Sequence, residues 1–507
     1  MQMLFSNAHP EELIDFLQEL IAAYKGSTPP RKRLRPLVDA DGNVPSPLKR
    51  LKSAKVEHAA HSPNTLEKLT RDLSDEQMAI FQMVQQGKSV FFTGGAGTGK
   101  SFLFKRLVRS LDPNTSVATA STGAASHNIG GVTLHSFSGI LSGDMTFAQA
   151  VKAAKRKIGN WKRCKTLLID EVSMIDGEYL DLLDAVARSV KNSTQPFGGL
   201  QVIICGDFLQ LPPVCKNRDV PKKFAFEAEC WPKLVPHCFE LRRIYRQKDD
   251  HQLIRVLRLI RVGVCNEEVQ KVLRSTQTNN KSIASDLKPT ELCTHVAEVE
   301  DKNEKFLTDL SGEEVAFTAL DNYYTEGDRA ALTSQLDHLC PAPTALVLKL
   351  GAQVMMCRNV DFKAGLVNGA RGVVVGFNTT ADRFGVRLPI VRFASGAEKV
   401  VHSETWAHKV FGREVAARTQ VPLRLSWAIS VHKSQGMTID LVNVNISKVF
   451  EFGQAYVALS RARTLEGLKV TGFTAANIRA NPKALQFYKK LRQATKLAET
   501  QKENVNK

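Results

Sequence analysis

The chain has 507 residues, too many for one compact core, and 43% of them are hydrophobic, so we expect a folded protein of three or more domains. Its formal net charge of +18 favours a polyanionic partner, with nucleic acid ahead of an acidic membrane surface. No apolar run approaches the ~20 residues of a membrane-spanning helix, and the nine cysteines are scattered without a close pair, which argues against a disulfide, zinc or iron–sulfur framework.

The region before residue 70 is expected to contribute little to the folded core. Residues 1–24 are predicted to hold a short amphipathic helix, and residues 25–68, rich in Pro, Ser, Lys and Arg, to form a disordered basic linker. The linker contains RKRLR (31–35) and KRLK (49–52), and each cluster fits a nuclear import signal, a loose DNA contact or a solvated charge run. Because the acidic N-terminus is a poor transit peptide, we expect the nucleus, with a mitochondrial share left open.

Apolar strands and amphipathic helices alternate from about residue 73. The expected strands are SVFFTG (89–94), SVATAS (116–121), TLLIDE (166–171) and LQVIICGD (200–207), and the expected helices cover residues 100–111 and 178–190. This alternation is typical of a parallel sheet with crossover helices. It predicts a first α/β domain over residues 70–247.

A second α/β domain is predicted over residues 248–497. Buried strands are expected over 345–356 and 441–446, while short strands joined by glycine turns fill the region near 376–417. Such strands without intervening helices predict a small β-barrel inserted into the domain. A helix over residues 483–497 is expected to close the fold, followed by a polar tail over 498–507.

The segment GGAGTGKS (94–101) fits the phosphate-loop pattern G-x-x-x-x-G-K-[ST], and it lies between a strand and a helix, as the motif requires. Its glycines let the backbone wrap around phosphate, while N–H groups and the helix N-terminus face the anion. Lys100 is expected to reach the β and γ phosphates, and the Ser101 hydroxyl to bind Mg²⁺. The predicted loop consists of Gly94, Gly95, Ala96, Gly97, Thr98, Gly99, Lys100 and Ser101.

Two carboxylates end the apolar strand in LLIDEVSM (167–174). At the carboxyl end of a parallel strand they would lie beside the phosphate loop, where Asp170 is expected to hold Mg²⁺ through water and Glu171 to polarise the attacking water. An acidic pair can also simply cap a helix, an alternative that the neighbouring phosphate loop weakens. Gln210, just past another strand end, is a candidate sensor of the γ-phosphate.

Two arginine-containing segments complete the predicted nucleotide site. ELRRIYRQ (240–247) and AYVALSRART (455–464) each offer a guanidinium group, and two such groups meeting at one γ-phosphate would stabilise transition-state charge. No Asn-Lys-x-Asp tetrapeptide is present in the sequence, which disfavours a GTPase.

The order of the motifs resembles that of superfamily one, group B helicases: DEQ (75–77), GGAGTGKS, ASTGAASHNIGGVTLHSFSGI, LIDEVSM, GDFLQLPPV, YRQ, SVHKSQGMTID and YVALSRA. PFGGLQVIICGDFLQLPP, GLVNGARGVVVGF and PLRLSWAISVHKSQGMTID are similar specifically to the Pif (petite integration frequency) family, in its eukaryotic, animal-type form. The resemblance covers about residues 70–490.

This resemblance implies two tandem RecA-like domains with an SH3-like barrel in the second. It also implies a monomeric, ATP- and Mg²⁺-dependent motor that moves 5′ to 3′ on single-stranded DNA. Such a motor would unwind duplex, forked or G-quadruplex DNA in genome and telomere maintenance, replication, repair or recombination. By position, the adenine reader, the γ-phosphate sensor and the two arginine fingers would be Gln77, Gln210, Arg246 and Arg461. Arg243 or Arg463 remains an alternative finger.

DNA contacts are expected on the opposite side of the sheets, through sequence-blind donors to phosphate. The candidates are Thr133, His135, His432, Lys433, Ser434, Gln435, Gln454, Arg463, Lys469 and Phe473. A lone histidine is more often a satisfied core residue, so both readings stay open for His135 and His432. The insert near 139–161 is where a duplex-splitting wedge would lie, although its sequence alone indicates only a basic helix.

Two rival functions are weaker. An ATPase that remodels proteins would leave the HKSQG segment and the basic surplus unexplained. A passive single-strand binder with a decayed ATPase site would not need intact nucleotide motifs.

Overall fold

The computed structural model describes residues 63–213, 222–247, 249–279, 287–326, 328–361, 366–378, 387–410 and 413–505. The predicted N-terminal helix and the two basic clusters lie outside these ranges. Helix α2 (Pro63–Thr70) corrects the end of the predicted linker. Leu69 of α2 is buried, and Arg106 donates to the Lys68 carbonyl at 2.9 Å, so an apolar side chain and a hydrogen bond anchor the end of this helix.

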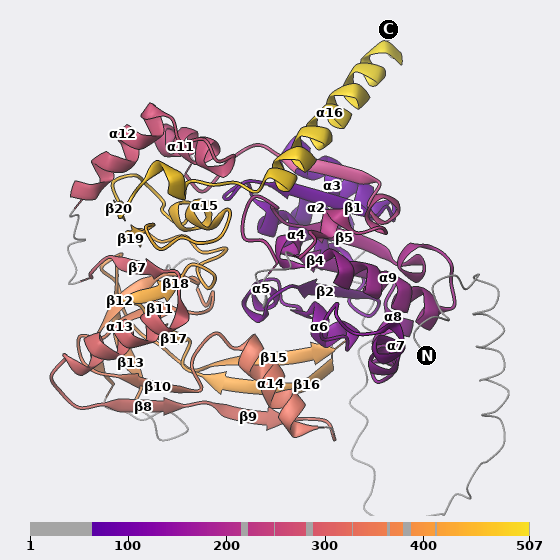
Figure 1. The fold of residues 1–507 in the computed structure, drawn as a ribbon. Coiled ribbons are helices and arrows are strands. Elements are labelled where there is room, and N and C mark those ends of the chain that lie inside the picture. Colours follow the sequence, from indigo (N-terminus) through magenta and orange to yellow (C-terminus); the bar gives the residue numbers. More distant parts are fainter. Residues whose placement is uncertain are drawn as a thin grey trace, which may run out of the picture. The chain divides into compact units, whose positions relative to one another are not determined.

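The first part of the chain forms a six-stranded parallel sheet in the order β3-β2-β4-β5-β1-β6 (Figure 1). Its strands are β1 (Val90–Gly94), β2 (Ser116–Ala120), β3 (Val132–Thr133), β4 (Thr166–Asp170), β5 (Gln201–Cys205) and β6 (His237–Leu241). Its helices are α3 (Asp75–Gln85), α4 (Lys100–Ser110), α5 (Gly123–Asn128), α6 (Leu134–Ser138), α7 (Phe147–Lys155), α8 (Ile158–Arg163), α9 (Gly177–Lys191) and α10 (Trp231–Leu234). The predicted parallel α/β fold is confirmed here, and the expected insert near 139–161 contains α7 and α8.

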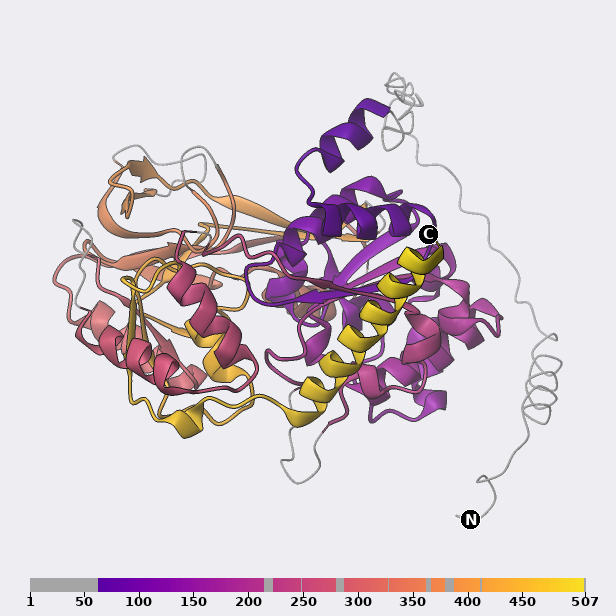
Figure 2. The same cartoon turned by 90° about the horizontal axis from the view of Figure 1, so that it is seen from above.

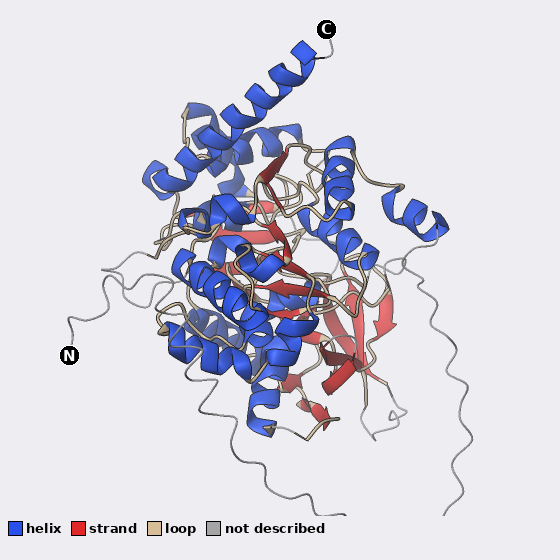
Figure 3. Cartoon of the chain, turned by 90° about the vertical axis from the view of Figure 1, so that its right-hand side faces the viewer, coloured by secondary structure: helices blue, strands red, loops and turns tan. Residues whose placement is uncertain are grey.

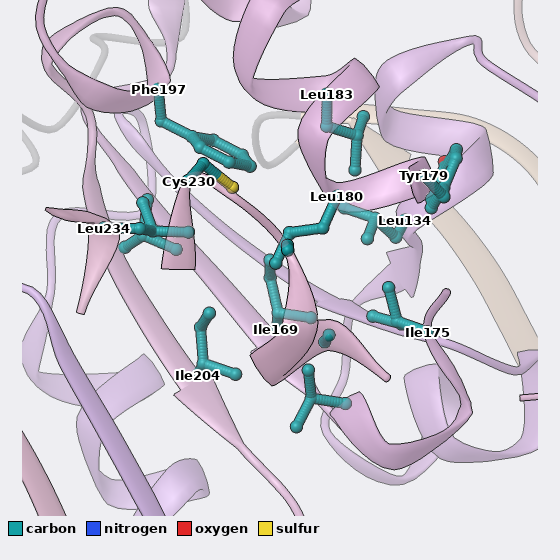
Figure 4. Close-up of a cluster of buried hydrophobic side chains, with 14 of the residues drawn as sticks. Leu134, Ile169, Ile175, Tyr179, Leu180, Leu183, Phe197, Ile204, Cys230 and Leu234 are labelled. Atoms are coloured by element: carbon teal, nitrogen blue, oxygen red, sulfur yellow. The ribbon is translucent and has the colours of Figure 1, made fainter. Parts of the chain in front are cut away.

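Helices cover both faces of this sheet, as the blue and red elements of Figure 3 illustrate. Successive side chains of a strand point to opposite faces, and Phe91 of β1 accordingly joins one core cluster while Val90 and Phe92 join another. Figure 4 shows part of the first cluster, in which Ile169 of β4 and Ile204 of β5 face the side chains of α9. The sheet edge that carries the phosphate loop is therefore fixed by packing on two sides.

The second part contains a four-stranded parallel sheet in the order β18-β7-β19-β20. The strands are β7 (Thr290–Cys293), β18 (Ala428–Ser430), β19 (Val442–Asn445) and β20 (Leu468–Thr471), and the helices are α11 (His251–Arg261), α12 (Glu267–Ser275), α13 (Val296–Thr308) and α15 (Gln454–Leu459). Short 3₁₀ turns occur in both parts of the chain. They are η1 (Val172–Met174), η2 (Pro196–Gly199) and η3 (Ala225–Glu227) in the first part, and η4 (Thr276–Thr278) and η5 (Ala475–Asn477) in the second. Within the described ranges, none of the helices has the length and apolar character that crossing a membrane requires.

Antiparallel strands separate β7 from β18 over a longer stretch than predicted. They are β8 (Val315–Thr318), β9 (Leu320–Tyr323), β10 (Ala345–Leu348), β11 (Gln353–Met356), β12 (Arg371–Phe377), β13 (Pro389–Phe393), β14 (Glu398–Val400), β15 (Glu404–Val410), β16 (Arg413–Gln420) and β17 (Leu423–Leu425), with helix α14 (Arg329–Leu339) among them. The single strand expected over 345–356 is wrong. A turn at residues 350–351 divides it, so β10 pairs with β8 whereas β11 pairs with β12 and β17. The SH3-like closure of these strands stays a prediction.

Helix α16 (Pro482–Val505) corrects two boundaries. It continues through most of the expected polar tail, and it packs on the first part of the chain instead of completing the second. Ala484, Tyr488 and Leu491 belong to the same buried cluster as Phe91 of β1. Figures 1 and 2 both place this helix, drawn in yellow, alongside the first sheet. Its spacing of apolar residues predicted a helix but could not indicate which core it covers.

Candidate nucleotide and nucleic-acid site

The phosphate loop joins β1 to α4, which confirms its predicted context. Gly97 and Gly99 have φ angles of 81° and 83°, where a side chain would be strained. A Cβ at Gly97 would also lie 2.8 Å from Arg246 Cβ, and one at Gly99 would lie 2.7 Å from Gln77 Nε2. Lys100 Nζ donates to the carbonyls of Gly94 and Gly95 at 2.7 and 3.1 Å, so its ammonium lies directly over the loop.

The buried side chain of Gln77 links helix α3 to this loop. Its Oε1 accepts from Ser74 N at 3.1 Å in a capping box, which leaves the Nε2 amide facing Gly99. Tyr245, which is 39% exposed, lies against the same glycine, and the guanidinium of Arg243 stacks over its ring at 5.3 Å. The aromatic ring of Tyr245 is a functional candidate that the sequence interpretation missed, although it directly precedes the predicted finger Arg246.

Asp170 and Glu171 lie side by side at the end of β4. Glu171 has a φ of 53°, and its backbone N–H donates to Asp170 Oδ1 at 2.8 Å. Left-handed backbone at a glutamate is costly, and such strain is concentrated at functional sites. Burial raises the pKa of Glu171 to about 7, with repulsion from Asp170 adding to it and Lys100 opposing it. Burial also raises the pKa of Asp170. Both carboxyls therefore occupy a position that a cation would stabilise.

A chain of amide groups connects the acidic pair to β5. Gln435 Nε2 donates to Glu171 Oε2 at 2.9 Å and to Gln210 Oε1 at 3.4 Å, while Gln210 Nε2 donates to Asp207 Oδ2 at 3.3 Å. The structure thus places the Gln435 amide at the acidic pair, and its predicted contact with DNA stays a prediction. The loop after β18 turns toward the first sheet, and no local pattern in HKSQG indicates that direction.

Arg461 and Arg246 meet near the acidic pair. Arg461 is 1% exposed, and its guanidinium donates to Val457 O and Ser460 Oγ, each at 2.8 Å. Arg246 donates to Ser460 O at 3.1 Å and to Gly436 O at 3.3 Å. Burial lowers the pKa of Arg461 to about 9, with repulsion from Arg246 adding to it, and burial lowers the pKa of Arg246 to about 10.

Within the described ranges, neither guanidinium forms an ion pair with a carboxylate, and Glu171 supplies only longer-range attraction. A buried cation and a half-buried cation that are both held by neutral oxygens are unfavourable until an anion joins them. The alternative finger Arg463 is exposed and instead pairs with Asp440, Nε to Oδ1, at 3.0 Å. The geometry therefore favours Arg461 and Arg246 over the alternatives.

A polar cavity of about 160 Å³ lies between the two sheets. It is lined by Ser101, Lys105, Thr122, Asn128, Asp170, Glu171, Asn359, Asn368, His432, Lys433 and Gln435, among others. Asn368 Nδ2 donates to Asn128 Oδ1 at 3.1 Å, which joins the antiparallel insertion to α5. The predicted DNA residues His432 and Lys433 thus border the nucleotide side of the molecule.

Several predicted DNA contacts have structural partners instead. Ser434 and Gln454 are fully buried: Ser434 Oγ donates to Val431 O at 2.8 Å, and Gln454 Oε1 accepts from Phe450 N at 3.1 Å. Phe473 packs against the second core. The side chains of Ser434 and Gln454 are therefore inaccessible in this structure, which their polar residue types did not indicate, and their contact with the strand stays a prediction.

Of the remaining candidate DNA contacts, some have side chains engaged in contacts within the protein, and others have side chains accessible to solvent. Thr133 Oγ1 caps α6 by accepting from Ser136 N at 3.1 Å, and the ring of His135 stacks on Tyr179 with centroids 4.9 Å apart. Burial lowers the pKa of His135 and of His432, so neither is a cation near pH 7. Lys433 and Arg463 are exposed and Lys469 is half-buried, and these three remain the candidate phosphate partners.

Asp207 and Arg261 are further site residues that the sequence interpretation missed. Asp207 is fully buried and receives Arg261 Nε and Nη2 at 3.1 and 2.8 Å. Burial opposes ionisation of Asp207, but Arg261 outweighs it and the net pKa lies below its ordinary value. Tyr456 OH accepts from Ala96 N at 2.7 Å, which ties the second part to the phosphate loop. The available signal was a carboxylate two residues past the end of β5, close to the carboxyl end at which Asp170 terminates the neighbouring β4.

Known proteins resemble this chain over most of its folded length. Residues 72–271 match the model described as "PIF1-like helicase", and residues 331–377 match "DNA helicase Pif1, 2B domain". The human "ATP-dependent DNA helicase PIF1" is 46% identical over 428 residues, which are 84% of this chain and 65% of that protein. The chain thus spans slightly less than two thirds of the length of this curated relative.

Two solved structures share the fold. The Pif1 helicase from Candida albicans has a TM-score of 0.66 and 36% identity, with 83% of this chain and 99% of that chain covered. The Pif1 helicase from Bacteroides in complex with ADP-AlF3 and ssDNA has a TM-score of 0.56 and 30% identity, with 83% and 97% covered. On the sequence identity and on the coverage of the Candida structure, the chain belongs to the PIF1-like helicase family.

Proposed function

We propose that the chain is an ATP-dependent DNA helicase that hydrolyses ATP between its two parallel sheets and moves along single-stranded DNA. The observation that carries this proposal is the pair of the buried Arg461 and the half-buried Arg246, both held by neutral oxygens near Glu171 and the phosphate loop. A γ-phosphate is the anion that such a pair would complement. The names of the relatives and the nucleotide- and DNA-bound Bacteroides structure support the same function.

In this proposal the nucleotide is held mainly by the first part of the chain. Lys100 exchanges the carbonyls of Gly94 and Gly95 for the β and γ phosphates, since an ammonium prefers charged oxygens. The Gln77 amide and the Tyr245 ring lie beside Gly99, where they would recognise and stack on adenine. Binding then uses groups that the fold already positions.

The residues present fit a magnesium ion. Ser101 and Asp170 line one cavity and offer hard oxygen donors, and the buried Asp170 carboxyl would gain from a nearby cation. No cluster of three or more His, Cys, Asp or Glu occurs in the described part of the chain, so phosphate oxygens would complete the coordination. When bound, Mg²⁺ would neutralise charge that develops on the phosphates.

Hydrolysis is assigned to Glu171, which would orient and polarise the attacking water. Gln435 fixes the Glu171 carboxylate through its 2.9 Å hydrogen bond, and Gln210 lies next to it to sense the γ-phosphate. Arg461 and Arg246 would stabilise the charge of the transition state. The exposed Lys433 stands two residues before Gln435, so movement at the acidic pair would be transmitted to a group that can grip the DNA backbone.

The finer features belong to the same proposal and rest on the family resemblance. They are 5′-to-3′ movement, action as a monomer, activity on forked and G-quadruplex DNA, and roles in telomere maintenance, replication, repair and recombination. Location in the nucleus, with a share in the mitochondrion, is part of the same proposal. The wedge function of the α7–α8 insert is likewise proposed.

The test compares the intact chain with Lys100→Ala in ATP hydrolysis with and without single-stranded DNA, and in unwinding of 5′-tailed, 3′-tailed and quadruplex substrates. We expect DNA-stimulated hydrolysis and unwinding of the 5′-tailed duplex, both lost in the variant. Hydrolysis that DNA does not stimulate would favour a protein-remodelling ATPase. DNA-stimulated turnover in Lys100→Ala would contradict the site.

A further inference from the structure

Tyr488 of α16 reaches the edge of the first sheet on which the phosphate loop begins. Its side chain is 2% exposed, and its hydroxyl lies 2.5 Å from Thr93 Oγ1, 3.0 Å from Asp207 Oδ1 and 3.2 Å from Phe208 N. Thr93 belongs to β1 immediately before the loop, and Asp207 follows β5. One hydroxyl from the far end of the chain therefore bridges two neighbouring strand ends.

The proton inventory fixes the direction of these three bonds. A tyrosine hydroxyl has one proton, and a carboxylate can only accept, so Tyr488 donates to Asp207. The Phe208 N–H can only donate, so it donates to the Tyr488 oxygen. The remaining bond must then run from the Thr93 hydroxyl to Tyr488. These three hydrogen bonds can therefore form together in only one pattern of donors and acceptors. That pattern would hold the Asp207 carboxylate in a single orientation.

The same helix also contributes to a cluster of charged residues around the buried Asp207. Arg261, which donates twice to Asp207, also lies over the Tyr488 ring at 4.8 Å and 3.6 Å from Glu240 Oε1. Arg492, one turn further along α16, donates to both Glu240 oxygens at 2.7 Å. Arg492 and Arg261 also border a cavity of about 420 Å³ whose walls include Gly95 and Thr98 of the phosphate loop.

Asp207 in turn is the start of the amide chain that ends at the acidic pair. Its Oδ2 accepts from Gln210 Nε2, and Gln210 Oε1 accepts from Gln435, which donates to Glu171. Since Gln210 can rotate its amide plane by half a turn, something must select the orientation that presents Oε1 to Gln435. Asp207 does so, because only the amide nitrogen can donate to a carboxylate.

We propose that Tyr488 is a positioning residue for ATP hydrolysis, which acts by orienting Asp207 and through it the γ-phosphate sensor Gln210. This inference rests on the proposed function and extends it to a helix that carries no helicase motif. Packing alone does not explain the hydroxyl, since a phenylalanine ring would fill the same place in the first core beside Phe487 and Phe91. The hydroxyl instead orients Asp207 and Gln210, and hydrolysis requires that the groups around the γ-phosphate are held in a defined geometry.

The test is Tyr488→Phe in the full chain, with Tyr179→Phe as a matched control. Tyr179 is 3% exposed in the same core, and its hydroxyl donates to Ile140 O at 3.0 Å, so the control loses a comparable buried hydroxyl away from Asp207. For Tyr488→Phe we expect kcat of DNA-stimulated ATP hydrolysis to fall about 10-fold, with the Kd for a non-hydrolysable ATP analogue changed less than about twofold. Tyr179→Phe should keep kcat within about twofold, with a similar change in Tm.

A double-mutant cycle with Gln210→Ala separates positioning from general stability. If Tyr488 acts through Gln210, Tyr488→Phe lowers kcat by less than about twofold once Gln210 is removed. Unchanged kcat in the single variant, or a full loss repeated in the double variant, would overturn the inference while leaving the proposed function intact. Absence of DNA-stimulated hydrolysis in the unaltered chain would overturn both. Where Tyr488→Phe does not fold, Thr93→Val removes a hydroxyl of the same network and must show the same separation of kcat from nucleotide affinity.

Discussion

The side-chain amide of Gln435 lies 2.9 Å from the carboxylate of Glu171, although 264 residues separate the two in the chain. The first residue belongs to a loop after β18 and the second to the end of β4, so this contact joins the two sheets at the proposed site of water activation. Its consequences differ from those of a DNA contact and can be measured.

Gln435→Ala should reduce kcat of DNA-stimulated ATP hydrolysis by about 10-fold or more, because the Glu171 carboxylate loses the group that orients it. The affinity for single-stranded DNA in the absence of nucleotide should change little. Lys433→Ala is the contrast: DNA affinity should fall, and the slope of log affinity against log salt should become shallower by about 0.7, as expected for one lost phosphate contact. If Gln435→Ala showed the same salt-dependent loss of DNA affinity, Gln435 would be a DNA contact.

Arg461→Ala should lower DNA-stimulated turnover by about 10³-fold, since it removes the buried member of the two cations proposed to meet the γ-phosphate. Single-stranded DNA binding without nucleotide should be retained. Arg463→Ala removes a guanidinium that is exposed and paired with Asp440, and turnover should fall far less. Rapid-quench hydrolysis and fluorescence anisotropy on the same preparations measure both properties. If Arg463→Ala lost more turnover than Arg461→Ala, Arg463 would be the arginine finger in place of Arg461.

The raised pKa of Glu171, about 7 in the folded chain against an ordinary 4.5, predicts a pH-dependent stability difference. Between these values the folded state holds a proton that the unfolded state has released, so this group's contribution to stability falls as pH rises from about 4.5 to about 7. Glu171→Gln removes that dependence. Without nucleotide, the Tm of Glu171→Gln minus the Tm of the unaltered chain should therefore become more positive as pH is raised from 5 to 7.5. A constant Tm difference across that range would show that Glu171 ionises normally.

Gln77→Glu separates base recognition from helix capping. A glutamate still accepts from Ser74 N and so preserves the capping box, but it has no amide to donate. We expect KM for ATP to rise by about 10-fold and the preference for ATP over GTP to narrow, with kcat and Tm close to those of the unaltered chain. Steady-state kinetics with both nucleotides test this. An unchanged KM with a lowered Tm would mean that Gln77 only caps the helix.

The nucleotide motifs were predictable because their chemistry is local. Eight consecutive residues define the phosphate loop, and Asp170 and Glu171 need only the strand that precedes them. The position of Gln435 was not predictable, since it depends on how a loop of one sheet approaches another. The burial of Ser434 and Gln454 was likewise hidden, because their residue types occur both on polar surfaces and at buried positions where the backbone supplies hydrogen bonds. The strand over 345–356 was misjudged because Lys349 and Gly351 were read as part of one apolar run, whereas Gly351 takes a φ of 83° in the turn between two buried strands.

The packing of α16 on the first sheet also constrains how the protein can be made. Thr93 and Tyr488 are 395 residues apart, yet they share a hydrogen bond in one core. Contacts of such long range form late, since a very large loop must close before they contribute. During synthesis the first sheet should therefore remain uncovered along this side until the region around residue 488 has left the ribosome. Polypeptides that stop before residue 482 would carry every nucleotide motif and still present an unsealed core to chaperones and proteases.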